Sequence, residues 1–142
     1  MAYERGKTVK PDAKTEADVL AMLDEFNGAF ARKDEQRIMA LFATDPDIVF
    51  IGLEADETAI GPNALEILLK EIFSRRESYS WEWKRRSVSA VESVAWVTVD
   101  AVVRAKGGER DLALPYRLTG VLEKRGDRWV WMQYHGSEPA GH

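Results

Sequence analysis

Apolar residues recur at intervals of three and four in the first half of the chain and at intervals of two in the second half. The first pattern predicts helices. One helix is expected to begin at Thr15, because a threonine hydroxyl can accept a hydrogen bond from a backbone N–H at a helix start. The apolar face that this helix is expected to bury consists of Val19, Leu20, Leu23, Phe26 and Phe30. A second, short helix is expected after Asp34, and a third after Gly61-Pro62, with a β-rich run at residues 48–51 between them.

The period-two pattern continues from Tyr79 almost to the end and predicts four strands. They are expected at residues 80–91, 94–105, 112–124 and 128–136, and their short connections make them antiparallel. Three helices followed by such a sheet define an α+β fold, a cone-like curved antiparallel sheet with the helices on its concave face. Residues 1–14 are expected to form a polar arm, and residues 15–138 a single domain.

The last predicted strand carries bulky side chains on both of its faces. Alternation places Trp129, Trp131, Gln133 and His135 on one face, and Val130, Met132 and Tyr134 on the other. Both faces are therefore expected to be covered, one by the helices and the other by a second subunit. A register shift of one residue would exchange the two faces.

Composition narrows the possible functions. The chain has 142 residues, a net charge of −4 and no cysteine. Cysteine chemistry is excluded, the acidic balance argues against nucleic-acid binding, and no apolar run has the length of a membrane span. We expect a cytoplasmic protein that needs no cofactor.

Short motifs spread along the chain resemble a known family. They are residues 30–34, 40–42, 47–52, 60–65, 94–97, 117–119 and 128–137. Together they resemble the nuclear transport factor 2-like superfamily and, within it, the SnoaL-like group, which also resembles the association domain of calcium/calmodulin-dependent kinase II. The resemblance runs from Thr15 to Glu138. It implies a pocket between the concave face and the helices, and a homodimer that buries the convex face.

The resemblance also extends to the ketosteroid isomerases, whose catalytic positions can be compared one by one. Phe26 stands where those enzymes have a tyrosine, Phe50 where they have the aspartate base, and Thr119 near their second aspartate. A phenyl ring neither accepts a proton nor donates a hydrogen bond, so that mechanism is not available. The Asp-His pattern of related cyclases has no clear counterpart either. No catalytic residue is assigned.

The resemblance and the strand parity together predict a largely aromatic ligand pocket, lined by Phe26, Phe30, Phe50, Trp96, Arg117, Thr119, Met132 and Tyr134. Such a pocket suits a small, flat organic molecule. Arg117 would hold an anionic group of that molecule. Alternatively, Arg117 pairs with an acid such as Asp100 or reaches solvent.

The expected dimer interface consists of Trp129, Trp131, Gln133 and His135. His135 is the only histidine besides His142, so it is either a general base or a hydrogen-bonded residue at the interface or at the end of the sheet. One histidine is not enough for a metal site, and none is expected. The acidic run Glu54 to Glu57 lacks calcium-loop spacing and is expected to be a solvated rim.

Two functions remain open at this point, and acid–base isomerase or cyclase chemistry is disfavoured against both. The first is a homodimeric protein that binds a small organic molecule, either neutral or anionic. The second is an assembly module similar to the kinase association domain, in which the pocket has no ligand.

Overall fold

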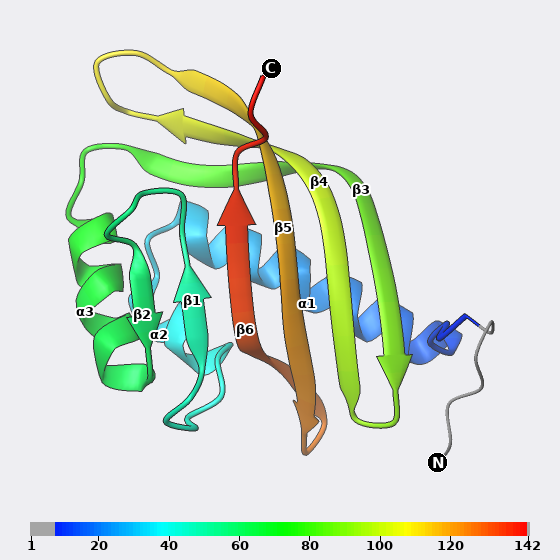
Figure 1. Ribbon diagram of the computed structural model, residues 1–142. Helices are drawn as coiled ribbons and strands as arrows, with labels where there is room; N and C mark the ends of the chain where they lie inside the picture. The colour runs from blue at the N-terminus through cyan, green and yellow to red at the C-terminus, as the bar shows by residue number, and fades with distance from the viewer. Residues whose placement is uncertain (1–7, 142) are drawn as a thin grey trace.

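The computed structural model describes residues 8–141 (Figure 1). The elements run in the order α1 (Ala13–Ala31), α2 (Glu35–Ala40), β1 (Val49–Ile51), β2 (Thr58–Ile60), α3 (Pro62–Phe73), β3 (Ser78–Val91), β4 (Val94–Lys106), β5 (Leu112–Arg125) and β6 (Arg128–Ser137). The predicted α+β fold, with a curved sheet and helices before the long strands, is confirmed.

The six strands form one sheet in the order β2-β1-β6-β5-β4-β3. The long strands pair antiparallel, as expected, but β1 pairs parallel to β6, with Phe50 opposite Tyr134. No partner was predicted for β1, and its parallel pairing makes the sheet mixed. Strand β2 was not predicted, because three residues are too few to show a period of two.

The helix starts follow local hydrogen-bonding chemistry. The carboxylate of Asp12 accepts from the backbone N–H of Thr15 at 2.7 Å, so α1 begins at Ala13, before the predicted start. Asp34 caps α2 as expected, accepting from the backbone N–H of Arg37 at 3.1 Å. Part of the predicted arm, residues 1–7, lies outside the described residues. Farther along that arm, the Val9 carbonyl accepts from the N–H of Ala90 in β3 at 3.0 Å.

Helix α1 lies across the inner face of the long strands, behind them in the view of Figure 1. In β4, five alternate residues that face this helix layer are buried: Ala95, Val97, Val99, Ala101 and Val103. Burying a valine or leucine side chain contributes about 1.5–3 kcal/mol relative to exposure. The interface between helices and sheet is therefore the main hydrophobic core.

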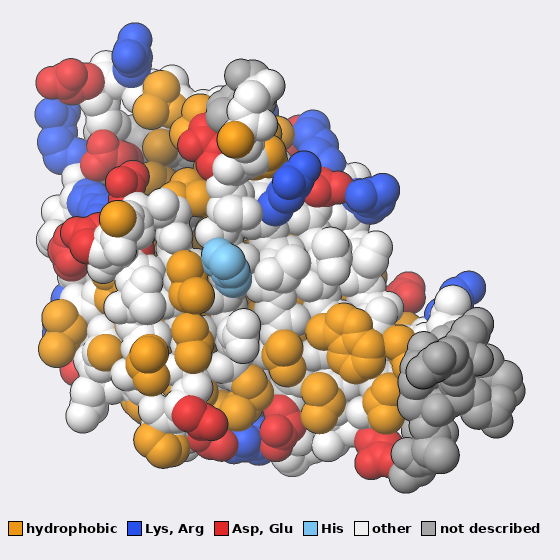
Figure 2. Space-filling view, in the orientation of Figure 1, with side chains coloured by type: hydrophobic (Ala, Val, Ile, Leu, Met, Phe, Trp, Pro, Cys, Tyr) orange, Lys and Arg blue, Asp and Glu red, His pale blue; other side chains and the backbone are white. Residues whose placement is uncertain are grey.

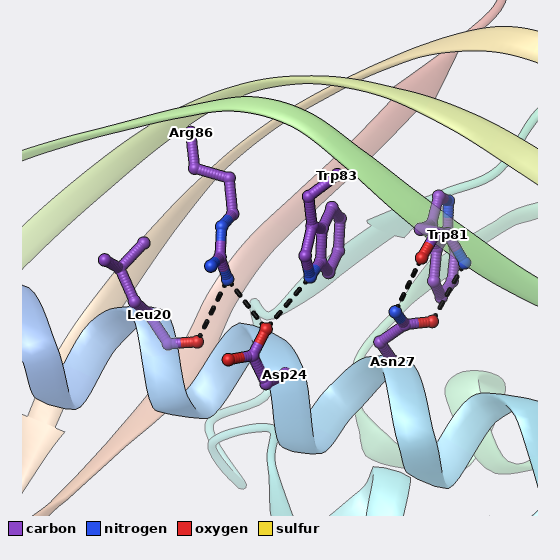
Figure 3. A network of polar contacts seen from close by, with 6 residues as sticks. All are labelled: Leu20, Asp24, Asn27, Trp81, Trp83 and Arg86. Atoms are coloured by element: carbon purple, nitrogen blue, oxygen red, sulfur yellow. Dashed lines mark hydrogen bonds and ion pairs between the residues drawn. The ribbon is translucent and has the colours of Figure 1, made fainter.

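Polar side chains attach α1 to the edge strand β3 (Figure 3). Asp24 accepts from the indole N–H of Trp83 at 3.0 Å and from Arg86 at 2.8 Å. Asn27 donates to the carbonyl of Trp81 at 2.7 Å and accepts from its N–H at 2.8 Å. Because β3 is an edge strand, it has no neighbouring strand on one side. Asn27 supplies hydrogen bonds that such a strand would make, and it fixes the backbone of Trp81.

A β-bulge in β6 changes which side chains face the helices. Val121 pairs with Gln133, whereas the next residue, Leu122, pairs with Trp131, so Met132 is the extra residue. The part of β6 that precedes the bulge does not pair with β1. It bonds instead to residues 41–43, where the N–H of Trp131 donates to the carbonyl of Leu41 at 2.8 Å.

The bulge places Trp131 on the same face as Tyr134. Trp131 is fully buried and its ring packs 5.6 Å from that of Phe26 in α1. Trp129, two residues before it, is also buried. The prediction that these two tryptophans share an outer face with Gln133 and His135 is wrong, because unbroken alternation does not hold across a bulge.

The outer face of the sheet carries a row of apolar side chains. Residues paired across β2, β1, β6, β5 and β4 form the row Ile60, Val49, Gln133, Val121 and Trp96. Ile60 is 64% exposed and Trp96 is 37% exposed. Figure 2 looks onto this face and shows hydrophobic side chains gathered across its lower half. Among the residues described, nothing covers this row.

Candidate functional site

A cavity of about 90 Å³ lies on the inner side of the sheet, where β1 and the long strands meet α1, α3 and the loop between β1 and β2. Its lining consists of Phe30, Phe50, Gly52, Leu53, Glu54, Glu57, Ile72, Arg75, Tyr79, Trp81, Val103, Tyr116 and Tyr134. Aromatic and aliphatic groups dominate, and a few polar groups converge among them, which is the usual composition of a small-molecule site.

Aromatic rings form one wall of the cavity. Phe50 and Tyr134 are stacked, with ring centroids 4.7 Å apart and planes within 7°. Phe26 packs behind Tyr134 and also stacks on Trp81, at 5.4 Å in each case. This packing leaves the rings little freedom, so the wall is preformed.

Two tyrosine hydroxyls meet at this wall. Tyr116 and Tyr134, from neighbouring strands, share a hydrogen bond and are almost completely buried. Burial raises the pKa of both phenols, and the negative charge of Glu57 acts in the same direction. Both hydroxyls therefore remain protonated at neutral pH and can act as hydrogen-bond donors.

A glutamate–arginine pair forms the polar side of the cavity. Glu57 is the only charged residue that is buried among residues 8–141, and its Oε2 lies 3.1 Å from a guanidinium nitrogen of Arg75. The other carboxylate oxygen accepts from the N–H of Glu54 at 3.1 Å. Burial alone would lower the pKa of Arg75, but Tyr79 and Glu57 raise it overall. The guanidinium of Arg75 therefore keeps its positive charge, and Glu57 is its partner.

Trp81 brings an unused donor to the lining. Its side chain is 7% exposed, and its indole nitrogen has no hydrogen-bond partner. A buried donor without an acceptor is unfavourable and uncommon in folded proteins. The indole of Trp131 shares this property, but Trp131 does not line the cavity.

The structure brings some of the predicted pocket residues together and separates others. Phe30, Phe50 and Tyr134 line the cavity, and Phe26 supports it from behind. Met132, at the bulge, lies 3.6 Å from Arg125 instead.

Trp96, Arg117 and Thr119, also predicted to line the pocket, lie on the outer face and are exposed. The expectation of an anion held by Arg117 inside the cone is therefore wrong. The alternating apolar set around Arg117 (Leu114, Tyr116 and Leu118) takes the inner face, because the helices cover that face. Asp100, considered above as a partner of Arg117, forms an ion pair with Arg85 at 2.8 Å.

Four residues of the lining were not predicted from the sequence: Trp81, Tyr116, Glu57 and Arg75. Tyr116 belongs to the apolar set of its strand, which is a signal that could have placed it inside. Glu57 lies in the run expected to be a solvated rim, and that expectation is wrong for this residue because Arg75 and the loop backbone compensate its burial. Nothing in the sequence indicated this pairing.

The remaining candidates lie away from the cavity. His135 is exposed on the outer face, opposite Thr119 and Ile51. Within residues 8–141, no group of three or more histidine, aspartate or glutamate side chains is placed to ligate a metal ion. Over the same range, no helix has both the length and the apolar character that a bilayer crossing requires. Both carboxylate oxygens of Glu57 have partners, which makes it a poor candidate for a general base.

The fold is that of an NTF2-like protein, and the sequence agrees. Residues 19–141 match the model of the SnoaL-like domain family, so the chain belongs to that family. No functionally curated protein is significantly similar in sequence to this chain.

Solved structures of the same fold carry different functional names. A candidate dehydratase of the NTF2-like family from Streptomyces avermitilis has a TM-score of 0.82 and 17% identity, over 93% of this chain and 100% of that one. A candidate calcium/calmodulin-dependent kinase II association domain from Xanthomonas campestris has a TM-score of 0.77 and 19% identity, over 100% of both chains. A candidate scytalone dehydratase from Novosphingobium aromaticivorans has a TM-score of 0.77 and 15% identity, over 89% of this chain and 85% of that one. At such identities the likeness shows the fold alone.

Proposed function

We propose that the protein binds a small, neutral organic molecule in the cavity inside the cone. The observation that carries this proposal is the aromatic cavity itself, with its stacked Phe50–Tyr134 wall and a few buried polar groups. A volume of about 90 Å³ is well below that of sites for drug-sized ligands. The ligand class is therefore compact, of about one ring.

The charges of the lining favour a neutral ligand over an anion. The one cationic side chain in the lining, Arg75, is already paired with Glu57, and Glu54 adds a second negative charge. An anionic ligand would lose its hydration without gaining an unpaired cation. The anionic ligand expected from the sequence is therefore not the class we propose.

Two adjacent valines of β4 provide a matched test. Val103 lines the cavity and is 7% exposed, whereas Val102 lies on the opposite face of the same strand. Val103→Phe should fill the cavity, and Val102→Phe should leave it open.

The assay is saturation-transfer NMR with three one-ring probes: ethylbenzene, acetophenone and phenol. We expect at least one probe to bind the wild type and Val102→Phe and to lose binding to Val103→Phe. If no probe binds the wild type, or if Val103→Phe binds as well as the wild type, the proposed function is wrong. Thermal unfolding of both variants verifies that each is folded at the temperature of the assay.

A second proposal, self-association, is favoured by the apolar row on the outer face. A row that includes exposed Ile60 and Trp96 is typical of a surface that another molecule covers. Two of the similar solved structures are named as candidate kinase association domains. We propose a homodimer through this face, with Gln133 and His135, predicted above as interface residues, in the contact.

Trp96→Glu tests the homodimer because it places a charge at the β4 end of the row. Sedimentation velocity should show a dimer for the wild type and a monomer for this variant. Lys106→Glu, at the end of the same strand, is the matched control and should remain dimeric. A monomeric wild type, or a dimer unchanged by Trp96→Glu, would exclude this interface.

A further inference from the structure

We infer that the tyrosine pair and Trp81 form a hydrogen-bond donor site that recognises a carbonyl oxygen of the bound molecule. This inference rests on the proposed function and adds the chemical class of the ligand. It assigns the ligand's orientation as well, with its oxygen toward the strands β3, β5 and β6 and its apolar part toward Phe30 and Ile72.

The count of donor hydrogens carries the inference. The indole of Trp81 and the hydroxyls of Tyr116 and Tyr134 supply one hydrogen each. The Tyr116–Tyr134 bond uses one of these three. Trp81 donates none. Two buried donor hydrogens therefore have no acceptor, and a ligand acceptor would remove that cost.

The three groups are close together and cannot easily turn away. The rings of Trp81 and Tyr116 lie 5.8 Å apart, and those of Trp81 and Tyr134 lie 6.5 Å apart. Asn27 holds the backbone of Trp81 through two hydrogen bonds. The hydroxyl of Tyr116 occupies the space where a Cβ at position 136 would be, so Gly136 makes room for it.

The protonation of the pair selects against anions and favours a neutral acceptor. Burial raises the pKa of both phenols, and Glu57 adds to this effect through its negative charge. The same negative charge would repel a carboxylate placed at the hydroxyls. A ketone or aldehyde oxygen accepts two hydrogen bonds without carrying a charge, which matches the two unused hydrogens.

The test compares acetophenone with ethylbenzene, which have nearly the same shape and differ in the carbonyl oxygen. Titration calorimetry should show acetophenone binding about tenfold more tightly than ethylbenzene, as expected for a hydrogen bond gained in a buried site. Tyr134→Phe and Tyr116→Phe should reduce this ratio toward one while ethylbenzene binds as before. Trp83→Phe is the control and should leave the ratio unchanged, because the indole N–H that it removes from β3 bonds to Asp24 and Trp83 does not line the cavity.

A second readout follows the indole directly. In ¹⁵N-labelled protein, the indole N–H signal of Trp81, identified by its absence in Trp81→Phe, should move downfield with acetophenone and remain in place with ethylbenzene. Equal affinities for the two probes, with no downfield movement, would refute the donor site and leave the proposed function intact. If neither of these two probes binds, the donor site is wrong, and if phenol does not bind either, the proposed function is wrong as well.

Discussion

Replacing Gly120 with alanine tests the placement of Trp131 that the bulge creates. Gly120 lies in β5, opposite Tyr134, and it faces the helix layer. A Cβ at this position would lie 2.6 Å from the carbonyl oxygen of Gln133, and it would overlap the ring of Trp131. Neither group can move easily, because the first belongs to the sheet backbone and the second is fully buried.

The expected loss of stability can be worked out from these contacts. Inserting a methyl group into a well-packed core costs about 1–3 kcal/mol. Lower entropy of the unfolded chain with alanine offsets about 0.4–1 kcal/mol of this. Because neither group can move, the cost is expected at the upper end of this range, so the free energy of unfolding should fall by about 2 kcal/mol. For a chain of this size that lowers Tm by about 4–8 °C.

Urea and thermal denaturation measure this change, and Gly28→Ala supplies a control of the opposite sign. Gly28 lies inside α1, and the nearest atom to a Cβ there is at the end of the Arg32 side chain, 3.1 Å away. Alanine in a helix interior is favoured over glycine by about 0.5–1 kcal/mol. If Gly120→Ala is as stable as the wild type, Trp131 does not occupy the inner face and our description of β6 is wrong.

Three further predictions concern polar groups. Asp24→Ala removes the acceptor of two hydrogen bonds from β3 and should lower the free energy of unfolding by about 1–3 kcal/mol in urea titrations; no change would show that these contacts do not hold α1 to the sheet. Hydrogen bonds from Lys84 and Arg104 lower the pKa of Glu82 from 4.5 to about 2, so the stability that they contribute should be present above pH 4.5 and lost as the pH falls toward 2. An NMR titration of this carboxylate with a midpoint near 4.5 would contradict that. Absorbance titration at high pH should show Tyr116 and Tyr134 ionising above the ordinary tyrosine range, because burial raises the pKa of both; ionisation of all tyrosines near pH 10 would refute it.

Periodicity predicted the order of the helices and the long strands because a core between a helix layer and a sheet imposes a regular pattern. The faces of individual strands were predicted less well. In β4 and β5, the apolar alternate residues lie inside, and following that rule would have placed Trp96 and Arg117 outside. In β6 the rule itself fails, because the bulge at Met132 changes the parity and moves Trp131 inward.

The candidate site was predicted only in part for a different reason. Phe30, Phe50 and Tyr134 were found because aromatic residues on helix and strand faces follow the same periodicity as the core. Glu57 and Arg75 lie in irregular segments, and they meet only when the loop after β1 packs against the end of α3. Such a long-range pairing leaves no local pattern in the sequence.

The location of a bound probe tests the central claim most directly, which is that the cavity inside the cone is the binding site. Nuclear Overhauser effects should be measured between acetophenone and methyl-labelled protein. We predict contacts to the methyl groups of Ile72 and Val103, which line the cavity. Contacts to Ile60 or Val121 on the outer face, without any to Ile72 and Val103, would contradict our account.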